Sequence, residues 1–123
     1  MAINFTLAAD AAVATALTRA VVVAANINDN TLIAAPAAGL RLAVAFLKGQ
    51  RTSGDVATTA VLIKAGATTI DYGAFSNDIP GQVFWDAASK LQFQMLPAAT
   101  ALIANHSAAN SITYTVRYIT VDA

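Results

Sequence analysis

The stretch TLIAAPAAGLRLAVAFLKG, residues 31–49, decides the fold class of this chain. It is almost wholly apolar, yet Pro36 and Gly39 interrupt it, so it fits neither one buried helix nor a membrane span of ~20 residues. Read at period two, it predicts a strand at 31–35, a turn through APAAG and a second strand at 40–48. One face of the second strand would carry Leu40, Leu42, Val44 and Phe46.

Short alternating segments separated by turn formers continue along the rest of the chain. Turn and loop residues cluster at 48–55, 77–81 and 105–110. Period-two patterns predict further strands at 19–27, 56–66, 68–75 (with a break at Gly73), 82–85, 91–96 and 111–121. The core-facing positions in these segments would be Thr59, Val61, Ile63, Ile112, Tyr114, Val116 and Tyr118.

The number and spacing of these segments indicate an all-β protein. At 123 residues the chain has the length of one domain, and short strands with regular turn signals are typical of a sandwich or barrel. We expect an antiparallel β-sandwich, jelly-roll-like, at 19–123, with an immunoglobulin-like sandwich as the alternative. Residues 1–18 would form an N-terminal arm, either extended or containing a short helix within 8–18 that Asp10 could cap.

Charge is sparse in this sequence: 11% of the residues are charged, against a typical ~25%. Basic and acidic residues balance, so the chain lacks the electrostatic footprint of a nucleic-acid-binding protein. The surface belongs either to a neutral monomer coated with Thr and Ala or to a protein covered by partners, because interface cores are depleted of charge. We favour the second interpretation. We expect no signal peptide, because Asp10 lies where its apolar core would run, and no membrane partner.

No group of residues points to catalysis. The single histidine, His106, lies in the polar segment ANHSAAN and is expected to be a surface loop residue. The segment NINDN, residues 26–30, has oxygen ligands but lacks the glycine and distal acid of a calcium loop, so we expect a turn with side-chain-to-backbone bonds. Nucleophile elbows and glycine-rich phosphate loops are missing from the sequence, and cysteine is absent. We therefore expect no enzyme, no metal site and no cofactor.

A few side chains are candidates for binding. Trp85, with Phe84 and Tyr72, could form a platform for a sugar, although packing in a core or interface is the commoner role of such residues. Arg41 and Arg117 fall on the second faces of core strands, where they would either be solvated or pair with a carboxylate across a subunit boundary. The candidate interface residues are Ile3, Phe5, Leu7, Arg41, Trp85 and Arg117.

The order of TLIAAPAAGLRLAVAFL, VLIKAGATTIDYGAF, LQFQMLPAATALIA and a Thr/Tyr-rich closing strand resembles the small head-decoration, or cement, proteins of tailed bacteriophages, over roughly residues 20–123. The resemblance implies a β-sandwich that forms a homotrimer and clamps subunits of the major capsid protein on the outer shell of the virion, after synthesis in the host cytoplasm. It also implies that the arm beginning MAINFTLAAD lies on the capsid or exchanges between protomers.

Two other functions stay open at the level of sequence. One is a carbohydrate-binding or adhesin domain of a phage fibre, in which Trp85 and Tyr72 stack on sugars. The other is a head–tail connector or tail component, which would differ from a decoration protein mainly in copy number and position on the particle.

Overall fold

A computed structural model describes residues 17–52, 58–87 and 92–123 of the chain. The candidate interface residues Ile3, Phe5 and Leu7, and nearly all of the segment in which a short helix was expected, lie outside the described residues. The first described strand begins at Thr18, at the end of the predicted arm.

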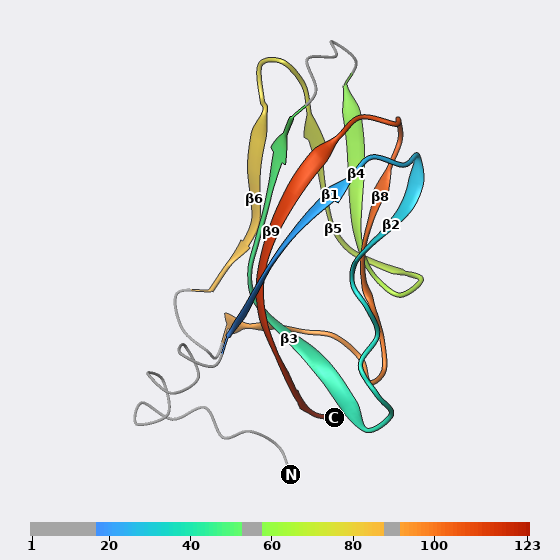
Figure 1. Ribbon diagram of the computed structural model, residues 1–123, viewed down its shortest axis with the longest axis vertical. Coiled ribbons are helices and arrows are strands. Elements are labelled where there is room, and N and C mark those ends of the chain that lie inside the picture. The colour runs from blue at the N-terminus through green and yellow to red at the C-terminus, as the bar shows by residue number, and fades with distance from the viewer. Residues whose placement is uncertain (1–16, 53–57, 88–91) are drawn as a thin grey trace.

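Within the described residues, the strands form two antiparallel sheets that pack face to face (Figure 1). The strands are β1 (Thr18–Ala24), β2 (Asn28–Ile33), β3 (Leu40–Arg51), β4 (Thr59–Ala65), β5 (Thr68–Phe75), β6 (Gly81–Asp86), β7 (Gln94–Met95), β8 (Leu102–His106) and β9 (Ile112–Asp122). The predicted all-β sandwich is confirmed.

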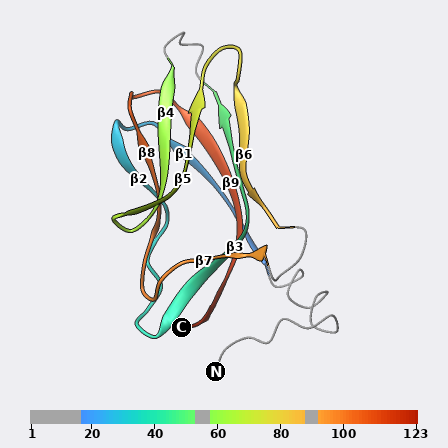
Figure 2. The same ribbon diagram turned by 180° about the vertical axis from the view of Figure 1, so that it is seen from behind.

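The strand order is that of a jelly roll. One sheet has the order β1-β9-β3-β6, with β7 paired to β3, and the other has the order β2-β8-β4-β5. The pairs β1–β9, β2–β8, β3–β6 and β4–β5 are nested around the β4–β5 hairpin, so the chain resembles one long folded ribbon rolled into two sheets (Figures 1 and 2). Strands far apart in the sequence therefore lie side by side.

The core lies between the sheets and follows the predicted alternation. Val61 and Ile63 of β4, and Ile112, Tyr114 and Val116 of β9, are fully buried. Further buried side chains from the two sheets include Leu42, Val44, Leu47, Phe75, Leu102 and Ala104. Tyr118 is partly buried and packs against the same cluster.

A β-bulge in β3 corrects one predicted face. Val44 pairs with Tyr118 and Phe46 pairs with Arg117, so Ala45 is an extra residue without a partner on β9. The bulge reverses the alternation, and Leu47 enters the core while Phe46 lies half-buried on the outer face, opposite an exposed arginine. The prediction that Phe46 shares the core face of Leu42 was wrong for this reason.

Three predicted segment boundaries also differ from the structure. β5 runs through Gly73 without a break, and the end of the flexible Gln82 side chain on β6 occupies the space that a Cβ would take. The strand expected at 91–96 is reduced to Gln94–Met95 among the described residues. β8 (Leu102–His106) occupies a region where we predicted no strand.

The turn after Pro36 is confirmed. Gly39 has a φ of 82°, in the left-handed region that favours glycine, and the amide of Leu40 donates to the carbonyl oxygen of Ala37 at 3.1 Å. This turn reverses the chain between the two sheets and places β2 and β3 in different layers.

Candidate interaction surface

The outer face of the five-stranded sheet carries exposed apolar side chains. β1 is an edge strand with the sequence TRAVVVA, in which Ala20 and Val22 pack against the core while Val21 and Val23 point outward. Val21 is 52% exposed and Val23 is 65% exposed. Val83, on the opposite edge strand β6, is 51% exposed. Exposed apolar residues that recur across one face are typical of interaction sites.

The strand register places these valines in two rows. Val21 pairs with Thr115, which pairs with Lys48, which pairs with Val83. In the next row Val23 is followed across the sheet by Thr113, Gln50 and Gly81. The face is therefore built from β-branched and small residues, with Lys48 as the charged side chain in these two rows.

Two arginines face each other in the following row. Arg19 of β1 pairs in register with Arg117 of β9, and both side chains are exposed. Neither guanidinium has an ion-pair partner in the described part of the chain. Like charges directly opposite each other on adjacent strands repel, so this pair destabilises the isolated sheet. A carboxylate from another molecule would bind between them in a charge-assisted contact.

Arg41 lies on the same face as Arg117, toward the other end of β3. It pairs with Val121 of β9. Val121 is four residues after Arg117, so the alternation of β9 places both residues on the same face of the sheet. Its side chain is half-buried, and its Nε is buried with no hydrogen-bond partner. The structure thus brings two of the predicted interface residues, Arg41 and Arg117, onto one sheet face.

Trp85 does not lie on that face. It pairs with the buried Leu47, and a register shift at Phe84 allows both aromatic residues to turn inward. Trp85 packs against the core and lines a cavity of about 50 Å³ between the sheets, together with Asp71 and Gln94. Its indole Nε1 is buried without a hydrogen-bond partner. This position supports packing rather than an exposed platform.

Tyr72 lies on the outer face of the four-stranded sheet, so the predicted pair of Trp85 and Tyr72 is not assembled. Its side chain is 73% exposed and is paired across the strands with Leu62, which is followed by Asn105 and then Asp29. Tyr72 therefore belongs to a different surface from the two arginines.

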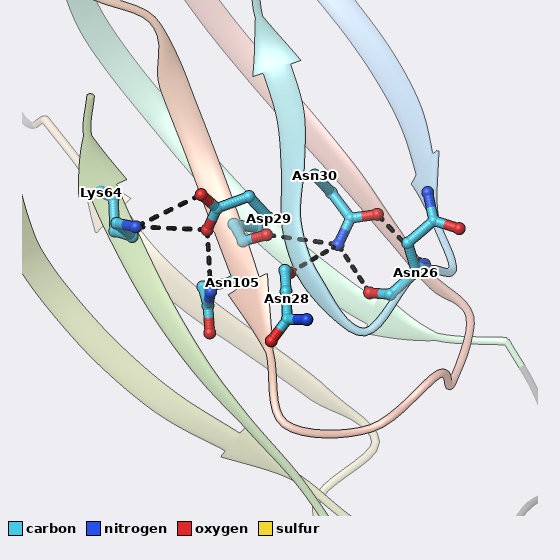
Figure 3. Close-up of polar contacts among 7 residues, drawn as sticks. Asn26, Asn28, Asp29, Asn30, Lys64 and Asn105 are labelled. Carbon is cyan, nitrogen blue, oxygen red and sulfur yellow. Dashed lines mark hydrogen bonds and ion pairs between the residues drawn. The ribbon is translucent and has the colours of Figure 1, made fainter. Parts of the chain in front are cut away.

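A polar network occupies the other end of that row (Figure 3). The side-chain amide of Asn105 donates to Asp29 at 2.7 Å, and the ammonium of Lys64 lies 3.2 Å from the same carboxylate. These two hydrogen bonds lower the pKa of Asp29 below its usual value. The network joins β2, β8 and β4 across the outer face of the four-stranded sheet.

The side-chain-to-backbone bonds expected at 26–30 are confirmed, with Asn30 as their main source (Figure 3). The turn itself is shorter than predicted, because the chain bends at Asn26 and Ile27 and β2 already begins at Asn28. The side-chain amide of Asn30 donates to the carbonyl oxygens of Asn26, Asn28 and Ala104, and its Oδ1 accepts from the amide of Asn26 at 3.1 Å. Asn28 has a φ of 70°, which asparagine tolerates better than most residues. The side chain acts as a structural replacement for backbone hydrogen bonds.

His106 was predicted to be a surface loop residue, and this was wrong. It is the last residue of β8, is only 1% exposed, and has Nε2 2.7 Å from the Tyr114 hydroxyl. Burial lowers the pKa of His106 and raises that of Tyr114, because both charged forms are disfavoured away from water. The alternation of Leu102, Ala104 and His106 is the sequence signal that could have revealed the strand.

The described residues contain no group of three or more His, Cys, Asp or Glu that could hold a metal ion. Over the same ranges, no helix is long and apolar enough to cross a membrane. No family model matches the chain, and neither a curated protein nor a solved structure matches it.

Proposed function

We propose that the chain is a capsid decoration, or cement, protein that forms homotrimers and clamps subunits of a major capsid protein on the outer shell of a virion. The outer face of β1-β9-β3-β6 is the observation that carries this proposal. It presents Val21, Val23 and Val83 to solvent beside the facing Arg19 and Arg117. In this proposal the function is mechanical, without catalysis or a cofactor.

The composition of this face suits burial against protein. Interface cores are poor in charge and rich in apolar residues, and the two valine rows expose Val21, Val23 and Val83 with Lys48 as their one charged side chain. An interface of standard size takes about 800 Å² from each partner. Contacts with two neighbouring protomers and the shell would cover about two fifths of the 6369 Å² surface, which accounts for the scarcity of charge.

The proposal is tested with a double variant, Val21→Thr with Val23→Thr. Threonine keeps the shape and β-propensity of valine but places a hydroxyl in the interface, so trimer formation and binding to undecorated capsids should weaken at least tenfold. Light scattering measures the oligomer and co-sedimentation measures the capsid binding. Leu62→Thr, on the outer face of the other sheet, is the matched control and should leave both unchanged. A monomeric wild type that fails to sediment with capsids would contradict the proposal.

The predicted arm at 1–18 belongs to the same proposal. Ile3, Phe5 and Leu7 would contact the capsid or a neighbouring protomer through their apolar side chains. Deletion of residues 1–16 should therefore reduce capsid binding while leaving the thermal stability of the sandwich unchanged. Binding at full strength by the truncated chain would exclude this role for the arm.

The exposed Tyr72 favours glycan binding as a second candidate function, as in an adhesin domain of a phage fibre. Its ring stands beside Leu62 in the same row as Asn105 and Asp29, so an aromatic face and hydrogen-bonding groups are close together. A glycan array should show binding that is lost in Tyr72→Ala and retained in Trp85→Phe. An unreactive array would remove this candidate.

A connector or tail role would be recognised by the position of the chain in an image of the particle.

A further inference from the structure

Arg51 is a buried cation at one end of the sandwich. It is the last residue of β3. Beyond the bulge at Ala45, the side chains of β3 alternate, so Leu47 and Gly49 point inward while Lys48 and Gln50 point outward. A Cβ built on Gly49 would lie 2.6 Å from the ring of Phe75 in the opposite sheet, so this face of β3 points between the sheets. The Arg51 side chain is 7% exposed and points the same way.

None of the three guanidinium nitrogens of Arg51 has a hydrogen-bond partner among the described residues. A guanidinium does not lose its proton in a protein, so burial cannot be relieved by neutralisation as it can for lysine or histidine. Removing an unpaired ion from water is strongly unfavourable, and buried charges are normally paired or bound to an ion. The position therefore calls for a negative charge from outside the described chain.

A buried polar pair, Asn110 and Thr59, is found close in sequence to the register partner of Arg51 and at the start of β4. Arg51 pairs in register with Ile112, and the neighbouring Asn110 donates its side-chain amide to the Thr59 hydroxyl at 2.7 Å. Thr59 and Asn110 are buried, and the Thr59 hydroxyl, which accepts that bond, keeps its own hydrogen for donation.

We propose that Arg51 binds an oxyanion at this end of the sandwich. The guanidinium offers a planar fork of N–H donors that matches the two oxygens of a carboxylate, phosphate or sulfate. The oxyanion comes either from solution, as free phosphate or sulfate, or from the carboxylate side chain of a neighbouring chain. This inference is independent of the valine face, because Arg51 points inward and that face points outward.

The test is thermal unfolding of the full chain in phosphate, sulfate or acetate, with chloride at equal ionic strength as the reference. A bound anion stabilises the folded state by mass action, so the Tm of the wild type should rise by a saturable amount on the order of 5 °C. Arg51→Met should abolish the rise. Lys48→Gln, which removes an exposed cation whose cross-strand neighbours Thr115 and Val83 are uncharged, should retain it and thereby correct for the general salting-out effect of these anions. Isothermal titration with inorganic phosphate gives the affinity directly.

The outcomes separate the sources of the anion. Saturable binding of phosphate by the wild type, and not by Arg51→Met, identifies a free anion as the ligand. A response to acetate that disappears when the assembled particle is used identifies a carboxylate supplied by a neighbour.

Asp55, four positions along the sequence and outside the described residues, supplies the decisive control. Equal Tm responses in wild type and Arg51→Met overturn the proposal. It is also overturned if the wild type gives no anion response and Asp55→Asn does, because Asp55 of the same chain would then supply the carboxylate. Arg51→Met is expected to fold, since replacing a buried unpaired charge by an apolar side chain is often neutral or stabilising.

Discussion

The Nε2 atom of His106 lies 2.7 Å from the hydroxyl oxygen of Tyr114, and this contact joins the two sheets of the sandwich. His106 ends β8 in the four-stranded sheet, and Tyr114 belongs to β9 in the five-stranded sheet. The two rings lie 5.8 Å apart between their centroids, inside the core. The Nδ1 atom of His106 is buried without a partner, so a charged imidazole would leave an unsatisfied N–H donor there.

Stability should therefore depend on pH through His106. Burial lowers the pKa of the folded histidine below its value of 6.5 in the unfolded chain. The unfolded chain binds the proton first, so stability is complete above about pH 6.5 and falls as the pH drops toward the folded pKa, by at most ~1.4 kcal/mol per pH unit. Urea unfolding between pH 7.5 and 5 measures this, in a window well above the titration of Asp29. His106→Gln should be flat over the same range, and a flat wild-type profile would contradict the prediction.

Asn30 should be sensitive to the nature of its replacement. Asn30→Ala removes the hydrogen bonds that close the 26–30 turn and should lower the free energy of unfolding by about 1–3 kcal/mol. Asn30→Asp should be worse than Asn30→Ala, because a carboxylate oxygen would then face the three carbonyl oxygens that now accept from the amide. Urea denaturation measures both. Asn28→Gly, which relaxes the left-handed φ in the same turn, is the control and should be nearly neutral.

Gly49 should not tolerate a side chain. A Cβ there would lie 2.6 Å from Phe75 and 3.2 Å from Tyr114, and both rings are fully buried. We expect Gly49→Ala to cost about 1–3 kcal/mol of unfolding free energy, as overpacking of a rigid core does. Gly81→Ala is the matched glycine control, because the nearest atom there is the end of the flexible Gln50 side chain, which can move aside. Equal effects of the two substitutions in chemical denaturation would show that the Phe75 ring adapts.

Relief of the arginine pair should stabilise the isolated chain. Arg19→Thr removes the like-charge repulsion with Arg117 and should raise the free energy of unfolding by about 0.2–0.5 kcal/mol at low salt. The gain should shrink at about 1 M salt, where the Debye length is only a few ångströms. Lys48→Thr, whose cross-strand neighbours are Thr115 and Val83, is the control and should show no such salt dependence. A loss of stability in Arg19→Thr would mean that the pair is compensated within the chain.

Much of this fold could be predicted from local patterns. The alternation of Thr59, Val61 and Ile63 in β4 and of Ile112, Tyr114 and Val116 in β9 is strong enough to identify the core faces from sequence alone. The failures have tertiary causes. The bulge at Ala45 depends on pairing with β9, and no local rule places it in an alanine-rich strand.

The candidate surface was harder to predict than the core. Arg117 was expected to lie on the second face of its strand, but its neighbour Arg19 is nearly the whole domain away in sequence and is found only from the register. His106 was misplaced because histidine next to asparagine and serine is typical of loops, and its position after Leu102 and Ala104 was given too little weight. Arg51 was missed because an arginine at a strand end is usually solvated, and only its burial distinguishes it.

The pairing of β1 with β9 sets the order of events during biosynthesis. Val21 pairs with Thr115, which follows it by 94 residues, so this pairing forms only after β9 has been made. β9 also separates β1 from β3, so a nascent chain that lacks β9 leaves the facing edges of β1 and β3 unpaired. Long-range pairing of this kind is slow and leaves the incomplete chain prone to association with its neighbours on a polysome. Synthesis of β9, rather than of any earlier strand, is therefore the step that permits the five-stranded sheet to form.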